Sequence, residues 1–385
     1  MQNFPAPNKL LPGSSQKFFR AISTFILRAT YYSRGVLAIP KTMRAIVYRG
    51  TNDLRVETVP VPRIGPGELL VKVAACGVCP TDIKKIHYGT VPPPRIFGHE
   101  TSGTIVKTGA KVRGFKTGER VALHHHVPCL KCDACRHRAF AQCAQYKRTG
   151  ITAGFEPAGG GFAEYVRVLS FVLPGVVKIP AKNSFEEGAM LEPVNTVLKA
   201  VKRLSLLVGD NVLVAGQGPI GLMFTRLLQL RGMNVLATDL MESRLKLAKK
   251  FGAKWTLNPS SEFRVSNFKF PVRAAILAVP SDAALVQAMQ MVGGAGQILL
   301  FAHTKRGALT ELDLASICVD EKDLIGSYSA DFTLQREVAR LVFSRRLDVR
   351  PLITHRFPLA ETAAAIELAS HPGPDSLKIL ISHGV

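Results

Sequence analysis

Four cysteines lie close together in one short stretch of this sequence. Of the seven cysteines in the 385-residue chain, Cys129, Cys132, Cys135 and Cys143 fall within fifteen consecutive positions. The total is odd and the four are too close for a spread framework of disulfides, so a reduced, cytoplasmic setting is expected. Four thiolates at such spacings are typical of a closed, structural zinc site. We therefore expect these residues to bind zinc.

A second set of metal-ligating residues lies upstream. The segment "CGVCPTD" contains Cys79, and twenty residues later "FGHE" contains His99 and Glu100. A lone cysteine or histidine is more often part of a core. A thiolate, an imidazole and a carboxylate together, however, suit a catalytic zinc with one coordination position left open. Two zinc sites of different type are therefore predicted per chain.

A glycine motif, "VLVAGQGPIGLMF", follows an apolar run and opens a helical pattern. Strand, glycine loop and helix in this order are the context in which GxGxxG binds a dinucleotide. Gly216 would permit the turn, Gly218 would admit the pyrophosphate, and Gly221 would allow close packing of helix on strand. The predicted cofactor contacts in the loop are Gly216, Gly218, Pro219, Ile220 and Gly221.

An acidic residue stands at the distance that this motif requires. Asp239 ends the next apolar run, 18 residues beyond Gly221. Its carboxylate would accept hydrogen bonds from the adenosine ribose and repel a 2′-phosphate, which predicts NAD as the cofactor. Arg244 could stack on the adenine or be an ordinary exposed arginine of a helix.

The pattern of the chain changes along its length. Residues 43–192 hold short alternating runs separated by Gly and Pro, which are typical of antiparallel strands, with the cysteine-rich lobe at 124–145. Residues 193–328 alternate apolar strands with helical patterns, which predicts βαβ units and a parallel sheet. Residues 329–385 read as two helices and one strand, a segment too small for a core of its own that should pack on the first domain.

Residues 1–42 form a basic extension that contains six Lys or Arg and no acid. Either it is a targeting segment, or the start codon is mis-assigned and Met43 begins the protein. The net charge of +22 leaves +16 for the rest of the chain once these six are subtracted. Such a charge is compatible with a solvated surface or with an anionic partner. No apolar run of about 18 residues occurs, so no membrane partner is expected.

Taken together, these motifs resemble the zinc-containing medium-chain dehydrogenases, the relatives of alcohol, sorbitol and threonine dehydrogenases. The similarity runs from Met43 to the C-terminus through "GVCPTD", "FGHETSG", the four-cysteine lobe, "MLEPVNTVLKAV", "GQGPIGL" and "LITHRFPLAETAAAIELA". It implies an α/β fold with a GroES-like β domain and a Rossmann domain with a doubly wound parallel sheet. It also implies a homo-oligomer, either a dimer or a tetramer.

The resemblance assigns further roles. Glu192 in "LEP" matches a carboxylate beside the catalytic zinc or a further ligand of it, although it could simply cap a helix. Thr81 matches the hydroxyl that relays the substrate proton, and Asp82 matches a residue that orients a ligand. The implied reaction is NAD-linked oxidation of a secondary alcohol, such as the polyols L-iditol and sorbitol, to a ketone by hydride transfer from a zinc-bound alkoxide.

Other substrates and one other class of protein stay open. Lys84 replaces the relay histidine of many relatives and Lys85 a substrate-facing tyrosine. If both face inward, they would suit an acidic or phosphorylated polyol; two solvated residues of a helix are the interpretation that we favour. Ser329 and Ala330 stand where sorbitol enzymes offer an arginine and a tyrosine, so threonine or a simple alcohol is an alternative. A basic, zinc-containing nucleic-acid-binding protein is the alternative of another class, but the dinucleotide motif argues against a nucleic-acid partner.

Overall fold

A six-stranded parallel sheet forms in the second half of the chain, and every neighbouring pair in it is parallel. Its order is β10-β9-β8-β11-β12-β13. Near-continuous apolar runs form these strands, because helices cover both faces of such a sheet. The strands are β8 (Asn211–Ala215), β9 (Asn234–Thr238), β10 (Trp255–Leu257), β11 (Val272–Leu277), β12 (Val292–Leu300) and β13 (Asp323–Gly326).

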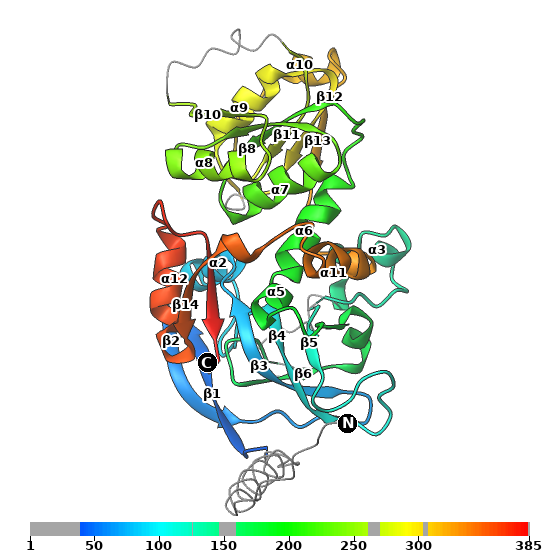
Figure 1. Ribbon diagram of the computed structural model, residues 1–385, viewed down its shortest axis with the longest axis vertical. Coiled ribbons are helices and arrows are strands. Elements are labelled where there is room, and N and C mark those ends of the chain that lie inside the picture. The colour runs from blue at the N-terminus through cyan, green and yellow to red at the C-terminus, as the bar shows by residue number, and fades with distance from the viewer. Residues whose placement is uncertain (1–38, 125, 146–158, 261–269, 303–306, 384–385) are drawn as a thin grey trace, which may run out of the picture. The chain divides into compact units, whose positions relative to one another are not determined.

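Four helices connect these strands (Figure 1). They are α7 (Pro219–Leu230), α8 (Glu242–Lys250), α9 (Asp282–Met291) and α10 (Leu314–Cys318). The strand order places β8 and β11 side by side at the centre, where the direction of strand addition reverses. This is the doubly wound arrangement, in which ligands bind at the carboxyl ends of the strands near that reversal. The predicted Rossmann fold is confirmed.

A mainly antiparallel sheet forms from both ends of the described chain. Its order is β14-β15-β3-β4-β5-β7, with β6 paired to β3, and a separate hairpin joins β1 to β2. The strands are β1 (Thr42–Gly50), β2 (Asp53–Pro60), β3 (Leu69–Gly77), β4 (Glu100–Thr108), β5 (Arg120–Ala122), β6 (Tyr165–Val168), β7 (Val177–Lys178), β14 (Ile353–Pro358) and β15 (Lys378–Ser382). The C-terminal segment thus returns to the first sheet, but with two strands instead of the one predicted. The Pro-bounded stretch "ITHRFP" forms β14 because β15 offers it a parallel edge.

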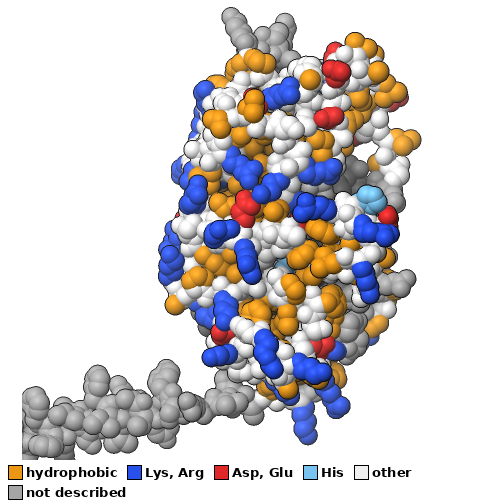
Figure 2. Space-filling model, turned by 90° about the vertical axis from the view of Figure 1, so that its right-hand side faces the viewer, with side chains coloured by type: hydrophobic (Ala, Val, Ile, Leu, Met, Phe, Trp, Pro, Cys, Tyr) orange, Lys and Arg blue, Asp and Glu red, His pale blue; other side chains and the backbone are white. Residues whose placement is uncertain are grey.

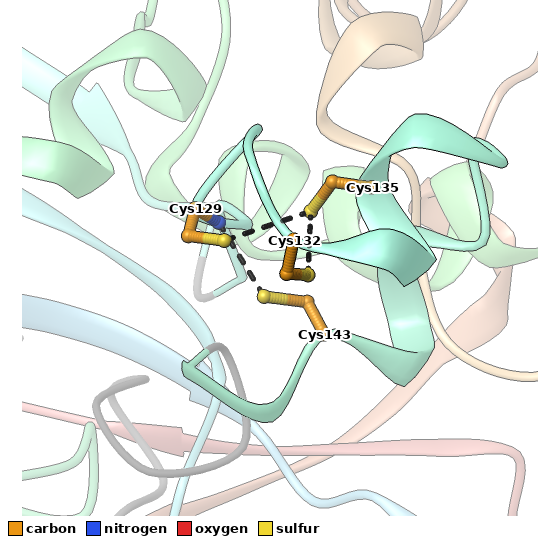
Figure 3. Close-up of side chains that lie close together, drawn as sticks. All are labelled: Cys129, Cys132, Cys135 and Cys143. Carbon is orange, nitrogen blue, oxygen red and sulfur yellow. Dashed lines mark hydrogen bonds between the residues drawn. The ribbon is translucent and has the colours of Figure 1, made fainter.

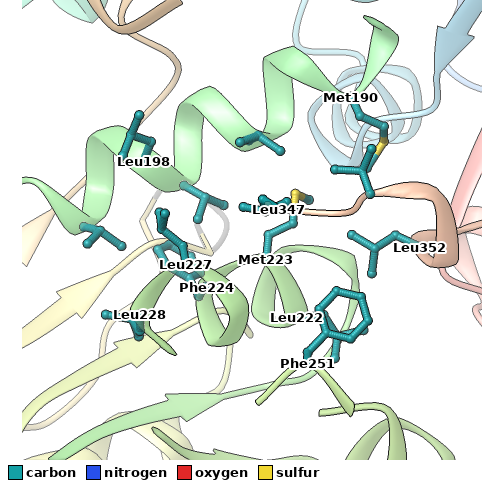
Figure 4. Close-up of a cluster of buried hydrophobic side chains, with 14 of the residues drawn as sticks. Met190, Leu198, Leu222, Met223, Phe224, Leu227, Leu228, Phe251, Leu347 and Leu352 are labelled. Atoms are coloured by element: carbon teal, nitrogen blue, oxygen red, sulfur yellow. The ribbon is translucent and has the colours of Figure 1, made fainter. Parts of the chain in front are cut away.

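In the described part of the chain, six further helices accompany this sheet and its connections. They are α2 (Pro80–Tyr88), α3 (Asp133–Arg136), α5 (Phe185–Ala189), α6 (Leu191–Val201), α11 (Gln335–Phe343) and α12 (Thr362–Ser370). Helix α6 is buried along almost its whole length. Figure 4 shows its Met190 and Leu198 facing Leu222, Phe224 and neighbouring side chains of α7 across one apolar core. Since truncating such a leucine costs about 2–5 kcal/mol, this core holds the start of α6 in a fixed place.

The computed structural model describes residues 39–124, 126–145, 159–260, 270–302 and 307–383. The predicted basic extension lies almost entirely outside these residues. Within them, Lys41–Val385 belongs to one compact unit, and no helix is long and apolar enough to cross a membrane. Figure 2 shows Lys and Arg side chains distributed over the visible face, with few acids between them.

Candidate active site and structural metal site

Two antiparallel strands bring Cys79 and His99 together although twenty residues separate them. Strand β3 ends at Gly77, and its register partner Glu100 begins β4. The chain therefore leaves one strand and enters the next at the same edge of the sheet. Cys79 follows β3 directly as the N-cap of α2, where its sulfur accepts a hydrogen bond from the Thr81 backbone N–H at 3.4 Å. Pro80 takes the first helical position, where its missing N–H is not needed.

The side chains of Cys79, His99 and Glu100 form one group. Their potential ligand atoms all lie within 4.8 Å of one another, and His99 and Glu100 are buried. His99 points its Nδ1 at the buried Asp82 carboxylate, at 3.1 and 3.2 Å from the two oxygens. Asp82 thereby fixes the ring and leaves Nε2 for a metal, an arrangement common around metal-bound histidines. The donor set fits zinc.

Electrostatics inside this group favour ionised partners. Burial acts to lower the pKa of His99, but the Asp82 carboxylate and the Cys79 sulfur hold this pKa well above its usual range. Burial likewise acts to raise the pKa of Asp82, yet His99 keeps that pKa lowered. An anionic pocket of this kind attracts a cation.

Lys378 is a member of the site that sequence reasoning missed. It begins β15, which pairs with β3, and its ammonium forms a buried ion pair with Glu100 and donates a hydrogen bond to the Val78 carbonyl at 2.9 Å. Burial acts to lower the pKa of Lys378, but Glu100 and Cys79 outweigh burial and raise this pKa. The only signal in the sequence is a lysine inside the apolar strand "LKILIS". Its partner Glu100 is more than 270 positions away, so only the fold could reveal the pair.

Glu192 lies beside the metal group but outside it. It is 5% exposed in the first turn of α6, and it is not among the side chains whose ligand atoms lie within 4.8 Å of one another. Burial raises the pKa of Glu192 to about 7. His99 acts to lower this pKa, and repulsion by Glu100 acts to raise it. This position agrees better with a carboxylate neighbouring the site than with a fourth ligand, and either role remains a prediction.

The four lobe cysteines converge, as Figure 3 shows. The Cys129 and Cys135 sulfurs are 3.9 Å apart, and those of Cys132 and Cys135 are 3.5 Å apart. A tetrahedral zinc with Zn–S bonds of about 2.3 Å separates its sulfurs by about 3.8 Å, whereas a disulfide would require about 2.05 Å. None of the seven cysteines forms a disulfide. The geometry therefore fits a metal and excludes a disulfide here.

The lobe also stabilises thiolate. Backbone N–H groups of Lys131 and Cys132 lower the pKa of Cys129 to about 6, whereas burial, reinforced by Cys132, raises the pKa of Cys135 to about 12. Four clustered sulfurs cannot all ionise without a cation between them. The donor set thus matches the predicted structural zinc.

The glycine loop has the shape required by a dinucleotide. Gly216 adopts φ +88°, which residues with side chains rarely adopt. A Cβ on Gly221 would come within 1.7 Å of the Gly216 carbonyl oxygen, so no other residue fits there, whereas the space beside Gly218 is open. Pro219 and Ile220 begin α7, whose N-terminus faces this opening. The loop can admit a pyrophosphate.

Asp239 follows β9 and braces this loop. Its Oδ2 accepts a hydrogen bond from the Gln217 backbone N–H at 2.6 Å, and its Oδ1 accepts one from the Met241 N–H at 2.9 Å. Arg244 places its Nη1 3.9 Å from Oδ2, and its side chain is only 14% exposed. The arginine is therefore packed against the carboxylate; its predicted stacking on adenine is untested.

A cavity of about 1510 Å³ is lined by Thr81, two positions from Cys79, whereas Cys79, His99 and Glu100 do not line it. Its lining includes Thr81 from α2, residues following the carboxyl ends of β11, β12 and β13, and part of the cysteine lobe. Tyr328 lines it as well. Partial burial raises the pKa of Tyr328, with smaller and opposing influences of His99 and Cys79 that indicate its proximity to them. The cavity joins the nucleotide-binding sheet to the candidate catalytic residues.

The residues around Ser329 differ in their surroundings. Ser327 and Tyr328 line the cavity, whereas Ala330 is buried at 2% exposure. Ser329 adopts φ 62° and turns its hydroxyl to His126 Nδ1 at 3.4 Å. Ser329 and Ala330 are not among the residues that line the cavity, and their match to the polyol-binding positions of sorbitol enzymes stays a prediction.

Comparison with known proteins agrees with this architecture. Residues 65–181 match the alcohol dehydrogenase GroES-like domain, and residues 219–344 match the zinc-binding dehydrogenase model. A sorbitol dehydrogenase of Bombyx mori is 30% identical over 353 residues, which cover 88% of this chain and 97% of the relative.

Solved structures show the same fold with cofactors bound. A zinc-binding dehydrogenase from Sinorhizobium meliloti bound to NADP superposes with a TM-score of 0.81 at 27% identity, covering 89% of this chain and all of that one. An alcohol dehydrogenase from Escherichia coli complexed with NADH gives a TM-score of 0.80 at 27% identity, again covering 89% and 100%. The chain therefore belongs to the zinc-dependent medium-chain dehydrogenase family and is an oxidoreductase that acts on alcohols.

Proposed function

We propose that this enzyme oxidises a secondary alcohol of the polyol class with NAD, and that Cys79, His99 and Glu100 hold its catalytic zinc. The observation that carries the proposal is the convergence of these three side chains beside a cavity that reaches the carboxyl ends of the nucleotide-binding strands. The relatives named sorbitol dehydrogenase support a polyol. Asp239, with its carboxylate at the ribose position, supports NAD over NADP.

The zinc supplies a Lewis acid that lowers the pKa of the substrate hydroxyl. The protein does the rest with its own groups. Thr81, which lines the cavity, would relay the substrate proton through its hydroxyl to water. Asp82 fixes the His99 ring, and Glu192 supplies a nearby acid–base group whose pKa of about 7 suits proton exchange near neutrality. Tyr328 is positioned to contact the polyol chain.

The experiment is a screen for NAD reduction by the zinc-loaded enzyme, with polyols, L-threonine and simple secondary alcohols as substrates and NADP alongside. Thr81→Val should lower kcat by about 100-fold or more, whereas Thr117→Val, at an exposed threonine, should not change it. Preferred turnover of threonine or simple alcohols would overturn the polyol assignment. Equal activity of Thr81→Val would overturn the proton relay.

We also propose a homo-oligomer. Among the described strands, β13 has a neighbour on one side only, and large apolar side chains that precede it in the chain are exposed: Leu309 at 93%, Leu314 at 73% and Val319 at 78%. Edge strands with exposed apolar neighbours favour pairing with a second chain. Sedimentation analysis would overturn this if it found only monomers.

A further inference from the structure

The cavity beside the metal group is lined by an excess of positive charge. Among the described residues of its lining, six are Lys or Arg and two are Asp: Lys84, Lys85, Arg138, Lys199, Lys202 and Arg203 against Asp282 and Asp331. A neutral polyol would require no such excess. A concave surface with charge of one sign concentrates ligands of the opposite sign.

Helix α2 presents two of these cations on its catalytic face. Thr81, Lys84, Lys85 and Tyr88 all line the cavity, at positions i, i+3, i+4 and i+7. Residues so spaced share one face of a helix. Both lysines therefore stand about one turn, roughly 5 Å along the axis, from the residue proposed to accept the substrate proton. Partial burial lowers the pKa of Lys84, opposed by Cys79, which agrees with a position between solvent and the metal group.

The cysteine lobe contributes a third cation. Arg138 lines the cavity with φ 57°, a conformation that is rare outside glycine. Its backbone N–H donates to the Cys135 carbonyl at 3.0 Å, so the metal-binding loop determines its placement. The lobe thus holds an arginine at the cavity as well as stabilising the fold.

Several of the other cations already have partners. Lys202 forms an ion pair with Glu337 at 2.9 Å. Burial lowers the pKa of Lys199, and attraction by the Asp331 carboxylate opposes this, so Asp331 partly balances the charge of Lys199. In the described part of the chain, neither Lys85 nor Arg138 forms an ion pair with a carboxylate. The excess charge therefore lies on the α2 and lobe sides of the cavity.

These cations are not where the cofactor phosphates are expected. The pyrophosphate belongs at the N-terminus of α7, beside the open space at Gly218. Neither the described glycine loop nor Asp239 contributes to the lining of this cavity. The α2 lysines instead adjoin Thr81 and hence the alcohol.

We propose that the alcohol substrate carries an anionic group, a phosphate or a carboxylate, which Lys85 binds together with Lys84 and Arg138. This inference rests on the proposed dehydrogenase function and narrows its substrate class to anionic polyols. Lysine binds a phosphate as a point charge and arginine offers a bidentate contact to either group. The reaction is unchanged: hydride passes to NAD, and the Thr81 hydroxyl accepts the substrate proton while it passes its own proton on to water, so the anionic group only binds.

The test compares sorbitol, sorbitol 6-phosphate and gluconate as substrates of the full-length, zinc-loaded enzyme with NAD. At least one anionic substrate should have a kcat/KM about tenfold or more above that of sorbitol. Lys85→Met should reduce this preference about tenfold through KM, which corresponds to the loss of one charge-assisted contact. Lys85→Arg should restore part of it, and Lys107→Met, at an exposed lysine of β4, should leave it unchanged. Preference for the phosphate or for the carboxylate identifies the group.

Two results would overturn the inference. One is a kcat/KM for sorbitol that equals or exceeds the values for both anionic substrates, together with a ratio between these values that Lys85→Met does not change. The other is a rise in the KM of NAD alone, which would assign the lysines to the cofactor. Calorimetric titration with sorbitol 6-phosphate and with gluconate gives a second readout without turnover. If the enzyme binds either compound and Lys85→Met weakens that binding, the inference is supported even if no alcohol is oxidised. If the enzyme binds neither compound, the inference is refuted.

Discussion

The ammonium of Lys378, on the last strand, forms a buried ion pair with the carboxylate of Glu100, which adjoins the candidate metal ligand His99. Both side chains are almost completely buried, at 6% and 2% exposure. The C-terminal return of the chain therefore does more than complete the sheet: it supplies the cation that balances a carboxylate of the site.

Replacing this lysine should be costly. Lys378→Met leaves Glu100 charged, buried and without its cation, which should lower the free energy of unfolding by about 3–5 kcal/mol. The double variant Lys378→Met with Glu100→Gln should regain much of that loss, because no buried charge is left unbalanced. Denaturant titration of the three proteins measures this. Additive effects of the two substitutions would show that the pair is not coupled.

Gly77 should not tolerate a side chain. A Cβ there would come within 1.7 Å of Glu100 Oε2, inside the buried pair, whereas a Cβ at Gly50 would meet nothing within 4 Å. Gly77→Ala should therefore destabilise the fold by about 1–3 kcal/mol, and Gly50→Ala should have a much smaller effect. Thermal unfolding compares them, and similar losses for both would contradict the proposed crowding.

The lobe should bind its own zinc. Cys132→Ser removes one of four sulfur ligands and should reduce the zinc content from two ions per chain to about one, measured by atomic absorption. Cys318→Ser, at an exposed cysteine far from either cluster in sequence, should retain both. Two zincs retained in Cys132→Ser would show that the lobe does not require all four thiols.

Asp239 should determine the choice of cofactor. Asp239→Ser removes the carboxylate that we propose as the partner of the ribose and should lower kcat/KM with NAD by about 10- to 100-fold, as expected for lost hydrogen bonds to a charged acceptor. Activity with NADP should rise, because repulsion of the 2′-phosphate is relieved and Arg244 remains nearby. A gain in activity with NADP would show that the substitution changes cofactor specificity and does not simply damage the enzyme. A parallel loss with both cofactors would mean that Asp239 only braces the loop.

His124 should make stability depend on pH. Burial, opposed by a hydrogen bond with Gln335, lowers its pKa to about 4 from the usual 6.5. The unfolded chain then binds a proton between pH 6.5 and 4 that the folded protein does not, so stability falls by up to about 3 kcal/mol as the pH drops through this window. His124→Gln should flatten the dependence, and His371→Gln, at an exposed histidine, should not. If the unfolding midpoint of the original protein and of both variants changed with pH in the same way, this role of His124 would be refuted.

Much of this molecule was predictable from local patterns. The lobe cysteines lie within fifteen positions, so one loop can bring them together whatever the rest of the fold does. The glycine loop and Asp239 belong to one βαβ unit, whose geometry follows from strand, turn and helix. The parallel sheet was predictable because its apolar runs differ in period from those of the antiparallel strands before it.

Other features depended on contacts between distant segments. Lys378 meets Glu100 because β15 pairs with β3, and a sequence does not state which strands pair. Tyr328 was overlooked because no local pattern shows that it lines the cavity, which is formed by segments distant in the sequence.

The sequence by itself determined which chemistry was available: two donor sets that suit zinc, a glycine loop that suits a dinucleotide, and an acid for which we propose a contact with its ribose. These depend on residue types at short spacing, which covalent geometry constrains. Only the tertiary structure decided how the charges are balanced and which lysines face the cavity. Burial and electrostatic pairing are properties of surfaces brought together by folding, and the free energy of each depends on neighbours that the chain supplies from far away in its length.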